Sequence, residues 1–377
     1  MKAPRFSLCA AALATALLAA CSSGSPRPEP AKLQAIDPVI DVSQAWAAKL
    51  GSTVNFPLQP QVLGNRVVLA ADDGTVAEFD AANGQRLWSA NAGDALTAGV
   101  GSDGHTSAVV TRSNQVVALA EGRVLWKHKL GTQSYTAPLV AGGRVFVLGS
   151  DHSVSAYDGN NGFLLWNQKS SMPAGRLVLS QPALLIPAYG ALFVGVAGNV
   201  VGFNPDTGAA LGDIPLASPR GVTDLAQVVD VLTPASRVGE SLCARAYQST
   251  VGCINLPAGK LEWVQPHVGT TGLGGNAQLL VGADNSDVLT GWVRQNGQPV
   301  WKNESFKHRR LSAPLVAGNH VVVGDAQGYV HVLSASTGEL RNRIRVDDSA
   351  IQIAPVLVGH TVIAVSSEGT VMGLRLQ

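Results

Sequence analysis

The sequence predicts an all-β fold, because short apolar runs alternate with turn residues along its whole length and one four-stranded pattern recurs. The clearest copy spans residues 138–166. Its apolar runs are separated by turns rich in Gly, Asp and Asn, as in an antiparallel meander. The turn at residues 158–162 contains only small or polar residues and one aspartate, which tolerate the positive φ of a tight hairpin. The rest of the chain repeats this pattern.

A glycine followed four residues later by a tryptophan marks the end of most copies. Eight equivalent positions occur, separated by 38 to 51 residues, and two of them have lost the tryptophan: Trp46, Trp88, Trp126, Trp166, Gly212, Trp263, Trp301 and Asn342. A four-stranded unit with a period of about 40 to 50 residues is the signature of a β-propeller. We therefore predict an eight-bladed β-propeller of four-stranded antiparallel blades.

The two ends of the chain each contain part of one blade. Residues 44–50 read as a lone strand that carries Trp46, and residues 353–374 read as three strands without a fourth. Pairing the N-terminal strand with the C-terminal blade would close the ring and remove sheet edges that favour aggregation. We expect residues 41–377 to form this closed propeller.

Length, composition and charge agree with a repeat protein. The chain has 377 residues, more than one ordinary domain, but a repeat array grows by adding units. Its 41 glycines and its low charged fraction of 14% suit buried sheets joined by tight turns. The formal net charge is only +1, so no basic surface for nucleic acid is expected.

The first 20 residues read as a signal peptide. Lys2 and Arg5 precede an apolar stretch, residues 6–20, that is too short to span a bilayer. The stretch ends in Leu-Ala-Ala before Cys21, which resembles the lipobox of bacterial lipoproteins. The alternative is an ordinary cleaved signal with a coincidental cysteine.

The lipobox resemblance implies that Cys21 is lipidated, and two or more acyl chains would anchor the protein stably. Ser22, in the position where an aspartate would signal retention, resembles lipoproteins sorted to the outer membrane. Residues 21–40 are rich in Ser and Pro near their start and are expected to form a flexible tether. The protein would then face the periplasm.

Two cysteines remain in the predicted propeller. Cys243 and Cys253 flank a hairpin whose tip lies near Gln248, so they could face each other across neighbouring strands. An oxidising periplasm permits a disulfide between them. Two buried free thiols are the alternative.

Two connections are longer than a propeller needs. They are residues 168–181 and 214–233, which precede the fourth and fifth blades and lie on one face of the ring. Loops held on a rigid scaffold often carry function, so we predict a contact surface here. The alternative is loop drift, since added loop length costs little entropy.

No motif for catalysis, metal binding or phosphate binding occurs. The eight histidines are scattered singly, and we interpret them as surface or turn residues. The glycine-rich residues 272–275 lack the lysine of a phosphate loop and are interpreted as a connection between blades. The repeated tryptophans are expected to pack between adjacent blades. No cofactor and no metal are expected.

The ending of the repeat, residues 156–166, resembles the tryptophan-docking motif of pyrroloquinoline quinone dehydrogenases. Those enzymes are longer and carry a Ca²⁺-ligating Glu and Asn with a catalytic Asp, which this sequence does not match. The lipobox, the length and the plain repeats instead resemble the outer-membrane protein assembly factor B lipoproteins of the Bam complex. This likeness covers the whole chain and is closest at Trp301, residues 311–316 and residues 321–331.

The resemblance to assembly factor B implies a non-enzymatic scaffold. It would bind the POTRA domains of the barrel-forming subunit and assist insertion of outer-membrane proteins. The family's partner-binding positions fall at Arg176 and Leu177, with an offset of about one residue, and at Asp230, where one of two acids is kept. These residues lie in the two long connections. The alternative function is a periplasmic quinoprotein-type dehydrogenase.

Overall fold

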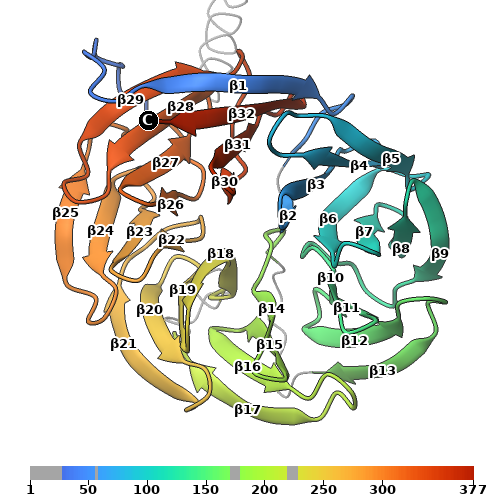
Figure 1. The fold of residues 1–377 in the computed structure, drawn as a ribbon. Helices are drawn as coiled ribbons and strands as arrows, with labels where there is room; N and C mark the ends of the chain where they lie inside the picture. Colours follow the sequence, from blue (N-terminus) through green and yellow to red (C-terminus); the bar gives the residue numbers. More distant parts are fainter. Residues whose placement is uncertain (1–27, 56–57, 170–178, 219–227) are drawn as a thin grey trace, which may run out of the picture.

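The computed structural model describes residues 28–55, 58–169, 179–218 and 228–377, and every regular element in these ranges is a β-strand. The strands form eight four-stranded antiparallel sheets around a central axis (Figure 1). The predicted eight-bladed β-propeller is therefore confirmed. Within the same ranges, no helix is long and apolar enough to cross a membrane.

Each blade runs outward from the axis in chain order. The first four blades are β2 (Gln61–Leu63), β3 (Arg66–Ala70), β4 (Thr75–Asp80), β5 (Arg86–Asn91); β6 (Leu96–Ser102), β7 (Ser107–Thr111), β8 (Gln115–Ala120), β9 (Arg123–Lys129); β10 (Leu139–Ala141), β11 (Arg144–Leu148), β12 (Ser153–Asp158), β13 (Leu164–Lys169); and β14 (Leu185–Ala188), β15 (Ala191–Val196), β16 (Asn199–Phe203), β17 (Ala210–Pro215).

The remaining blades follow the same plan, except that the eighth takes its outer strand from the N-terminus. They are β18 (Val231–Val238), β19 (Ser241–Ala246), β20 (Thr250–Asn255), β21 (Lys260–Pro266); β22 (Gly274–Gly275), β23 (Leu279–Ala283), β24 (Leu289–Val293), β25 (Pro299–Asn303); β26 (Leu315–Ala317), β27 (His320–Gly324), β28 (Tyr329–Ser334), β29 (Leu340–Arg345); and β30 (Val356–Val358), β31 (Thr361–Val365), β32 (Thr370–Leu376), β1 (Val42–Lys49).

The core lies between neighbouring blades rather than in one central mass. The second and third strands of each blade are almost wholly buried, because both of their faces pack against another blade, and their β-branched residues suit this position. The fourth strands are mostly exposed, and in five of them the residue at the tryptophan position is buried, as Trp166 in β13 shows. The ring therefore depends on contacts between blades for its stability.

The ring closes by strand pairing. β1 pairs antiparallel with β32 from Val42 opposite Leu376 to Lys49 opposite Thr370. The backbone N–H of Gln377 donates to the carbonyl of Asp41 at 3.0 Å, so the two ends of the propeller meet. The predicted pairing of the N-terminal strand with the C-terminal blade is confirmed.

Five tryptophans dock onto the blade that follows their own. Each ring lies over the glycine of the next blade's outer turn, where an added Cβ would come within 2.4 to 2.6 Å of the indole; the pairs are Trp46 with Gly84, Trp126 with Gly162, Trp166 with Gly208, Trp263 with Gly297 and Trp301 with Gly338. Each indole N–H also donates to a backbone carbonyl of that blade; the acceptors are Ala81, Gly159, Pro205, Arg294 and Ala335. The repeated Gly and Trp thus hold adjacent blades together.

The other three junctions differ from this pattern. Trp88 donates its indole N–H to Glu78 within its own blade. Asn342 replaces the indole in the seventh blade and donates from Nδ2 to the carbonyl of Ile40 at 2.7 Å. In the fourth blade, Gly212 stands at the tryptophan position, and no described side chain takes the place of the indole on Gly259 of the next blade.

The structure corrects two expectations. His331 is not a surface or turn residue, because it is fully buried in β28 and its Nε2 lies 2.8 Å from Oδ2 of Asp325, which also accepts from Arg309. The residues Gly274 and Gly275 are not merely a connection, because they form β22, the innermost strand of the sixth blade. Neither residue has a side chain, so no apolar run marked this strand.

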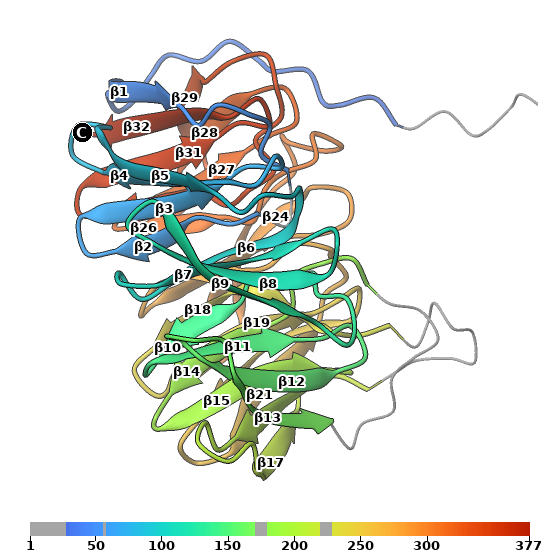
Figure 2. The same ribbon diagram turned by 90° about the vertical axis from the view of Figure 1, so that its right-hand side faces the viewer.

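Part of the predicted tether runs along the seventh blade. The backbone N–H of Ala31 donates to the carbonyl of Lys307, and Arg309 donates to the carbonyl of Ala31 at 2.8 Å. Further along, the N–H of Val39 donates to the carbonyl of Arg341. In Figure 2 this segment follows the edge of the disc before entering β1. Ala31 and Val39 are thus attached to the seventh blade and to the connection that enters it.

Candidate functional site

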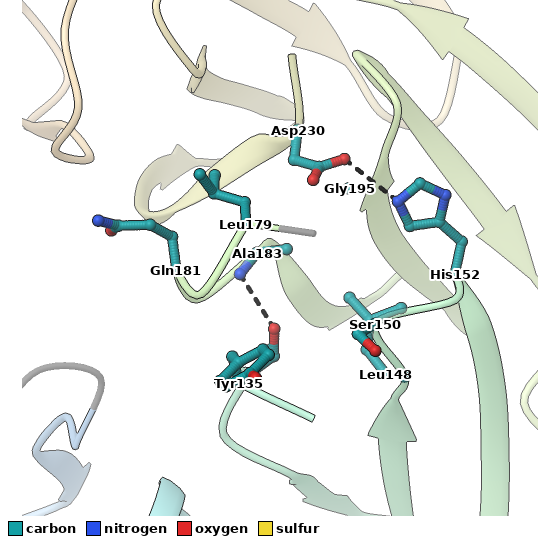
Figure 3. Close-up of a pocket in the computed structure, with 11 residues that line it drawn as sticks. Tyr135, Leu148, Ser150, His152, Leu179, Gln181, Ala183, Gly195 and Asp230 are labelled. Atoms are coloured by element: carbon teal, nitrogen blue, oxygen red, sulfur yellow. Dashed lines mark hydrogen bonds and ion pairs between the residues drawn. The ribbon is translucent and has the colours of Figure 1, made fainter. Parts of the chain in front are cut away.

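The two long connections meet at a small depression on one face of the ring. It is lined by residues of the third, fourth and fifth blades and has a cavity of about 30 Å³ (Figure 3). The described ends of both connections take part, with Leu179 and Gln181 from the first and Asp230 from the second. The depression therefore joins the segments that the repeat spacing singled out.

Asp230 is held at the edge of this depression. Its Oδ1 accepts a hydrogen bond from the backbone N–H of Ala197 at 3.0 Å and lies 3.4 Å from Nε2 of His152. Both side chains are mostly buried, with 20% of Asp230 and 15% of His152 exposed. The carboxylate thus links the second hairpins of the third and fourth blades to the start of the fifth.

Neighbouring bonds fix the first connection against the third blade. The backbone N–H of Ala183 donates to the hydroxyl of Thr136 at 3.0 Å. The backbone N–H of Leu184 donates to the carbonyl of Val231 at 2.8 Å, which joins the segment just after the first connection to the end of the second. Any partner that contacts one connection here will also be close to the other.

The size and chemistry of the depression favour a protein contact. A cavity of about 30 Å³ holds one or two water molecules, whereas small-molecule sites usually measure about 300–1,000 Å³. Its rim combines a carboxylate, an imidazole, the phenol of Tyr135 and the aliphatic Leu179 (Figure 3). Such mixed polar and apolar surfaces are typical of interfaces between proteins.

The predicted site residues are only partly within the described chain. Asp230 lies in the depression, whereas Arg176, Leu177 and the lipidation site Cys21 lie outside the described residues. His152 was expected only to be a surface or turn histidine, and its role beside Asp230 was not predicted. It stands in the turn between β11 and β12, and no motif connects it with a carboxylate 78 residues away.

The two cysteines of the propeller lie directly opposite each other. Cys243 in β19 pairs with Cys253 in β20, and both are fully buried. Their Sγ atoms are in contact, as the expected disulfide requires. This placement follows from a hairpin whose tip is equidistant from both residues.

A second cavity, of about 250 Å³, lies where the connections entering the fourth, sixth, seventh and eighth blades converge. Its acids are Asp284 and Asp287, and Asp287 accepts hydrogen bonds from the backbone N–H groups of Arg310 and Leu311 at 2.7 and 2.9 Å. Burial raises the pKa of Asp287, and the nearby Asp284 adds to this effect. Among the described residues, no group of three or more His, Cys, Asp and Glu side chains is arranged to hold a metal ion.

Comparison with known proteins identifies the family. A family model described as outer membrane protein assembly factor BamB matches residues 37–94, 72–303 and 304–376. A protein of that name from Burkholderia pseudomallei is 33% identical over 369 residues, which cover 97% of each chain. Another from Bordetella pertussis is 32% identical over 357 residues, which cover 94% of this chain and 92% of the relative.

Solved structures share the fold. The crystal structure of BamB from Moraxella catarrhalis matches with a TM-score of 0.79 at 22% identity, and the match covers 89% of this chain and all of that one. Quinohemoprotein alcohol dehydrogenase from Comamonas testosteroni matches with a TM-score of 0.67 at 15% identity, over 89% of this chain and 76% of the enzyme. The match to the family model and the similarity to full-length relatives show that this chain belongs to the outer membrane protein assembly factor BamB family.

Proposed function

We propose that this protein is a non-enzymatic scaffold of the outer-membrane β-barrel assembly machinery. In this proposal it binds the POTRA region of the barrel-forming subunit, through a surface made by Arg176, Leu177 and Asp230, and assists insertion of outer-membrane proteins. The full-length relatives are named as outer membrane protein assembly factors, which supports the role. The convergence of the two long connections at Asp230 is the structural observation that supports this surface.

The same proposal places the protein at the inner side of the outer membrane, anchored through lipid on Cys21. Ala31 forms hydrogen bonds with Lys307 and Arg309, which lie in the connection between the sixth and seventh blades. Connections of this type share one face with Asp230. Ten residues separate Cys21 from Ala31 and span at most about 35 Å when extended. The proposed anchor would therefore keep this face of the ring close to the membrane.

The test is co-purification from solubilised outer membranes. The lipidated protein and a double variant, Arg176→Ala with Leu177→Ala, would each be used to capture the barrel subunit. We expect the double variant to lose the partner, because interface energy is concentrated in a few central residues. The matched control is Arg123→Ala with Leu125→Ala on the exposed β9 strand, which should retain it. Equal capture by all three proteins would exclude this surface.

Asp230 is tested with a conservative substitution, because its carboxylate also accepts a hydrogen bond from the backbone N–H of Ala197. Asp230→Asn keeps an oxygen acceptor but removes the charge. We expect weaker capture of the partner with an unchanged unfolding transition. A variant that binds normally would remove Asp230 from the interface.

The dehydrogenase alternative has a direct test of its own. The purified protein would be mixed with pyrroloquinoline quinone and Ca²⁺ and then separated from free cofactor. A scaffold is expected to elute without the absorbance of the quinone. Retained quinone, together with alcohol-dependent dye reduction, would establish the enzyme instead.

A further inference from the structure

The junction between the fourth and fifth blades has an empty place where five other junctions hold an indole. Gly212 of β17 stands at the tryptophan position, and Gly259 stands at the position of the receiving glycine. A Cβ added to Gly259 would meet no atom within 4 Å, whereas the five receiving glycines are in contact with an indole. This vacant indole site is formed by residues 189–193, 200–202, 211–214 and 256–259.

The vacant indole site is a largely apolar cavity of about 400 Å³. Phe193, Ile214 and Leu256 line it and are almost completely buried. At its mouth, Tyr189 is 52% exposed and Leu211 is 60% exposed. Its volume falls within the range of sites that bury small molecules or large side chains. Apolar surface of this kind gains free energy when an aromatic ring covers it.

The third blade shows what the site lacks. Phe146 occupies the position in β11 that Phe193 occupies in β15, since they pair with Ala156 and Gly202 respectively. The ring of Phe146 packs against Trp166, with centroids 5.9 Å apart. Among the residues that the structure describes, no aromatic ring packs against Phe193 in this way, so a ring that completes its packing would come from elsewhere.

The backbone of the site keeps part of the indole-binding geometry. In the third blade, the carbonyl of Gly159 accepts the N–H of Trp126, and the N–H of Gly159 donates to Gly143. Leu256 is the equivalent residue of the fifth blade, because its N–H donates to Glu240 in the same way, at 3.0 Å. One bond differs: the N–H of Gly162 donates to the carbonyl of Asp158, whereas the N–H of Gly259 donates to the carbonyl of Leu256 at 3.2 Å. An indole here would therefore use the second lone pair of the Leu256 carbonyl.

The chain has no tryptophan left to fill this site. It contains seven tryptophans in all, and the segments outside the described ranges contain none. Five are docked at other junctions, Trp88 is bonded to Glu78, and Trp292 is buried in β24 against His267. An indole in the vacant indole site must therefore belong to another molecule.

We propose that the vacant indole site binds an aromatic side chain, tryptophan by preference, from another polypeptide. The ring would lie on Phe193 and over Gly259, and its N–H would donate to the carbonyl of Leu256. The turns that form the mouth, between β14 and β15 and between β20 and β21, are on the opposite face from the connections that carry Asp230. This site is thus separate from the surface proposed for the POTRA contact, and either could fail without the other.

Two substitutions block the site from opposite sides. Gly202→Leu would project into the cavity, and its Cβ would meet its nearest neighbour, Phe193, at an ordinary 3.5 Å. Gly259→Ala would put a methyl group where the indole has to lie. The matched control is Gly202→Ala, because alanine is present at this position in two blades that do hold an indole, as Ala118 and Ala156.

The experiment is a titration of the full protein with a capped pentapeptide that has a central tryptophan, followed by saturation-transfer NMR or calorimetry. Matched peptides with a central leucine or alanine serve as comparisons. We expect millimolar binding of the tryptophan peptide to the unmodified protein and to Gly202→Ala, as a single buried side chain allows. Binding should be about tenfold weaker or more for either blocking variant and for the alanine peptide.

Three results would overturn the proposal. One is a tryptophan peptide that does not bind the unmodified protein at all. Another is equal binding to the unmodified protein and to both blocking variants, once their unfolding transitions show that they are folded. The third is a leucine peptide that binds as tightly as the tryptophan peptide, which would show a general apolar patch.

Discussion

His267 is partly buried beside the guanidinium of Arg245, and its burial together with this contact keeps the imidazole neutral. Nη1 of Arg245 is 3.1 Å from Nδ1 of His267 and 3.1 Å from its carbonyl oxygen. The pKa of His267 is lowered to about 4, chiefly by burial and next by the charge of Arg245, while the charge of Asp284 acts in the opposite direction. Burial also lowers the pKa of Arg245, to about 10, so the guanidinium stays charged and the imidazole stays neutral.

This pair predicts a loss of stability in mild acid. The folded pKa of His267 lies below its unfolded value of about 6.5. Between about pH 4 and pH 6.5 the unfolded chain binds more protons, so stability falls as the pH falls through this window. We expect His267→Gln to remove about 2 kcal/mol of this loss, after allowance for the partial exposure of the ring. Urea unfolding at pH 7.5 and pH 4.5 measures it.

The control for that experiment is His360→Gln, at an exposed histidine in the last blade. It should leave the pH dependence of unfolding as it is in the unmodified protein. If His267→Gln and the unmodified protein lose the same free energy on acidification, the neutral, buried state of His267 is not the cause.

Individual contacts were the least predictable part of this molecule. The spacing of the repeats indicated the connections that meet at Asp230, but not its partner His152, because the two are brought together only by the packing of three blades. The same applies to His331, since its place on the buried face of β28 looks like any other alternating strand position. The sequence shows a polar residue in a strand, but it does not show which buried partner compensates the free-energy cost of removing that residue from water.

At the scale of elements, the glycines of the outer turns test the docking of tryptophans. Gly162 and Gly259 are equivalent, with φ of 75° and 61°, but only Gly162 is covered by an indole. Alanine at either position costs about 1–2 kcal/mol for the left-handed backbone. Gly162→Ala should cost about 1–3 kcal/mol more, because its methyl group meets Trp126 within 2.5 Å. Thermal or urea unfolding of the two variants gives the comparison, and equal costs would argue against tight docking.

The β19–β20 hairpin carries the proposed disulfide between Cys243 and Cys253. A bridge that closes a loop of this length is worth about 2–3 kcal/mol in the chain-entropy treatment. We expect thiol titration of the unfolded, unreduced mature chain to find neither cysteine of the propeller free. Reduction should lower the unfolding free energy by that amount, and the variant with both cysteines changed to alanine should not respond to reductant. Two titratable thiols would contradict the bridge.

The strands themselves were largely predictable from their residues. Second and third strands are short, β-branched runs between turn residues, and the glycine and tryptophan positions fixed their phase in each blade. The exceptions follow from missing side chains. β22 consists of two glycines, so nothing marked it as a strand. The fourth blade could be placed only by its turn, since Gly212 had replaced the tryptophan.

For the whole molecule, the incomplete ends predicted how the ring closes. Within the eighth blade, no turn connects β1 to β32, because these strands lie at opposite ends of the chain. Only their pairing holds β1 in the blade. This end of the chain also contributes to the core, because Trp46 of β1 is docked on Gly84 and Leu50, which directly follows β1, is almost fully buried. The free energy of the ring should therefore depend on β1 being present, and not on its place in the sequence.

A circular permutant separates these two requirements. Because the N–H of Gln377 already donates to Asp41, a short turn can join Gln377 to Val42, and new ends can be opened at residue 52, after β1. All strand pairs are kept, so we expect a monomer with an unfolding free energy within about 1–2 kcal/mol of the original. A chain that instead begins at residue 52 loses β1 and leaves β32 as an open edge. That chain should unfold at lower urea and form dimers or larger species in size-exclusion chromatography, because unpaired edges recruit other strands. If it stays monomeric and equally stable, pairing of the chain ends contributes little to the ring.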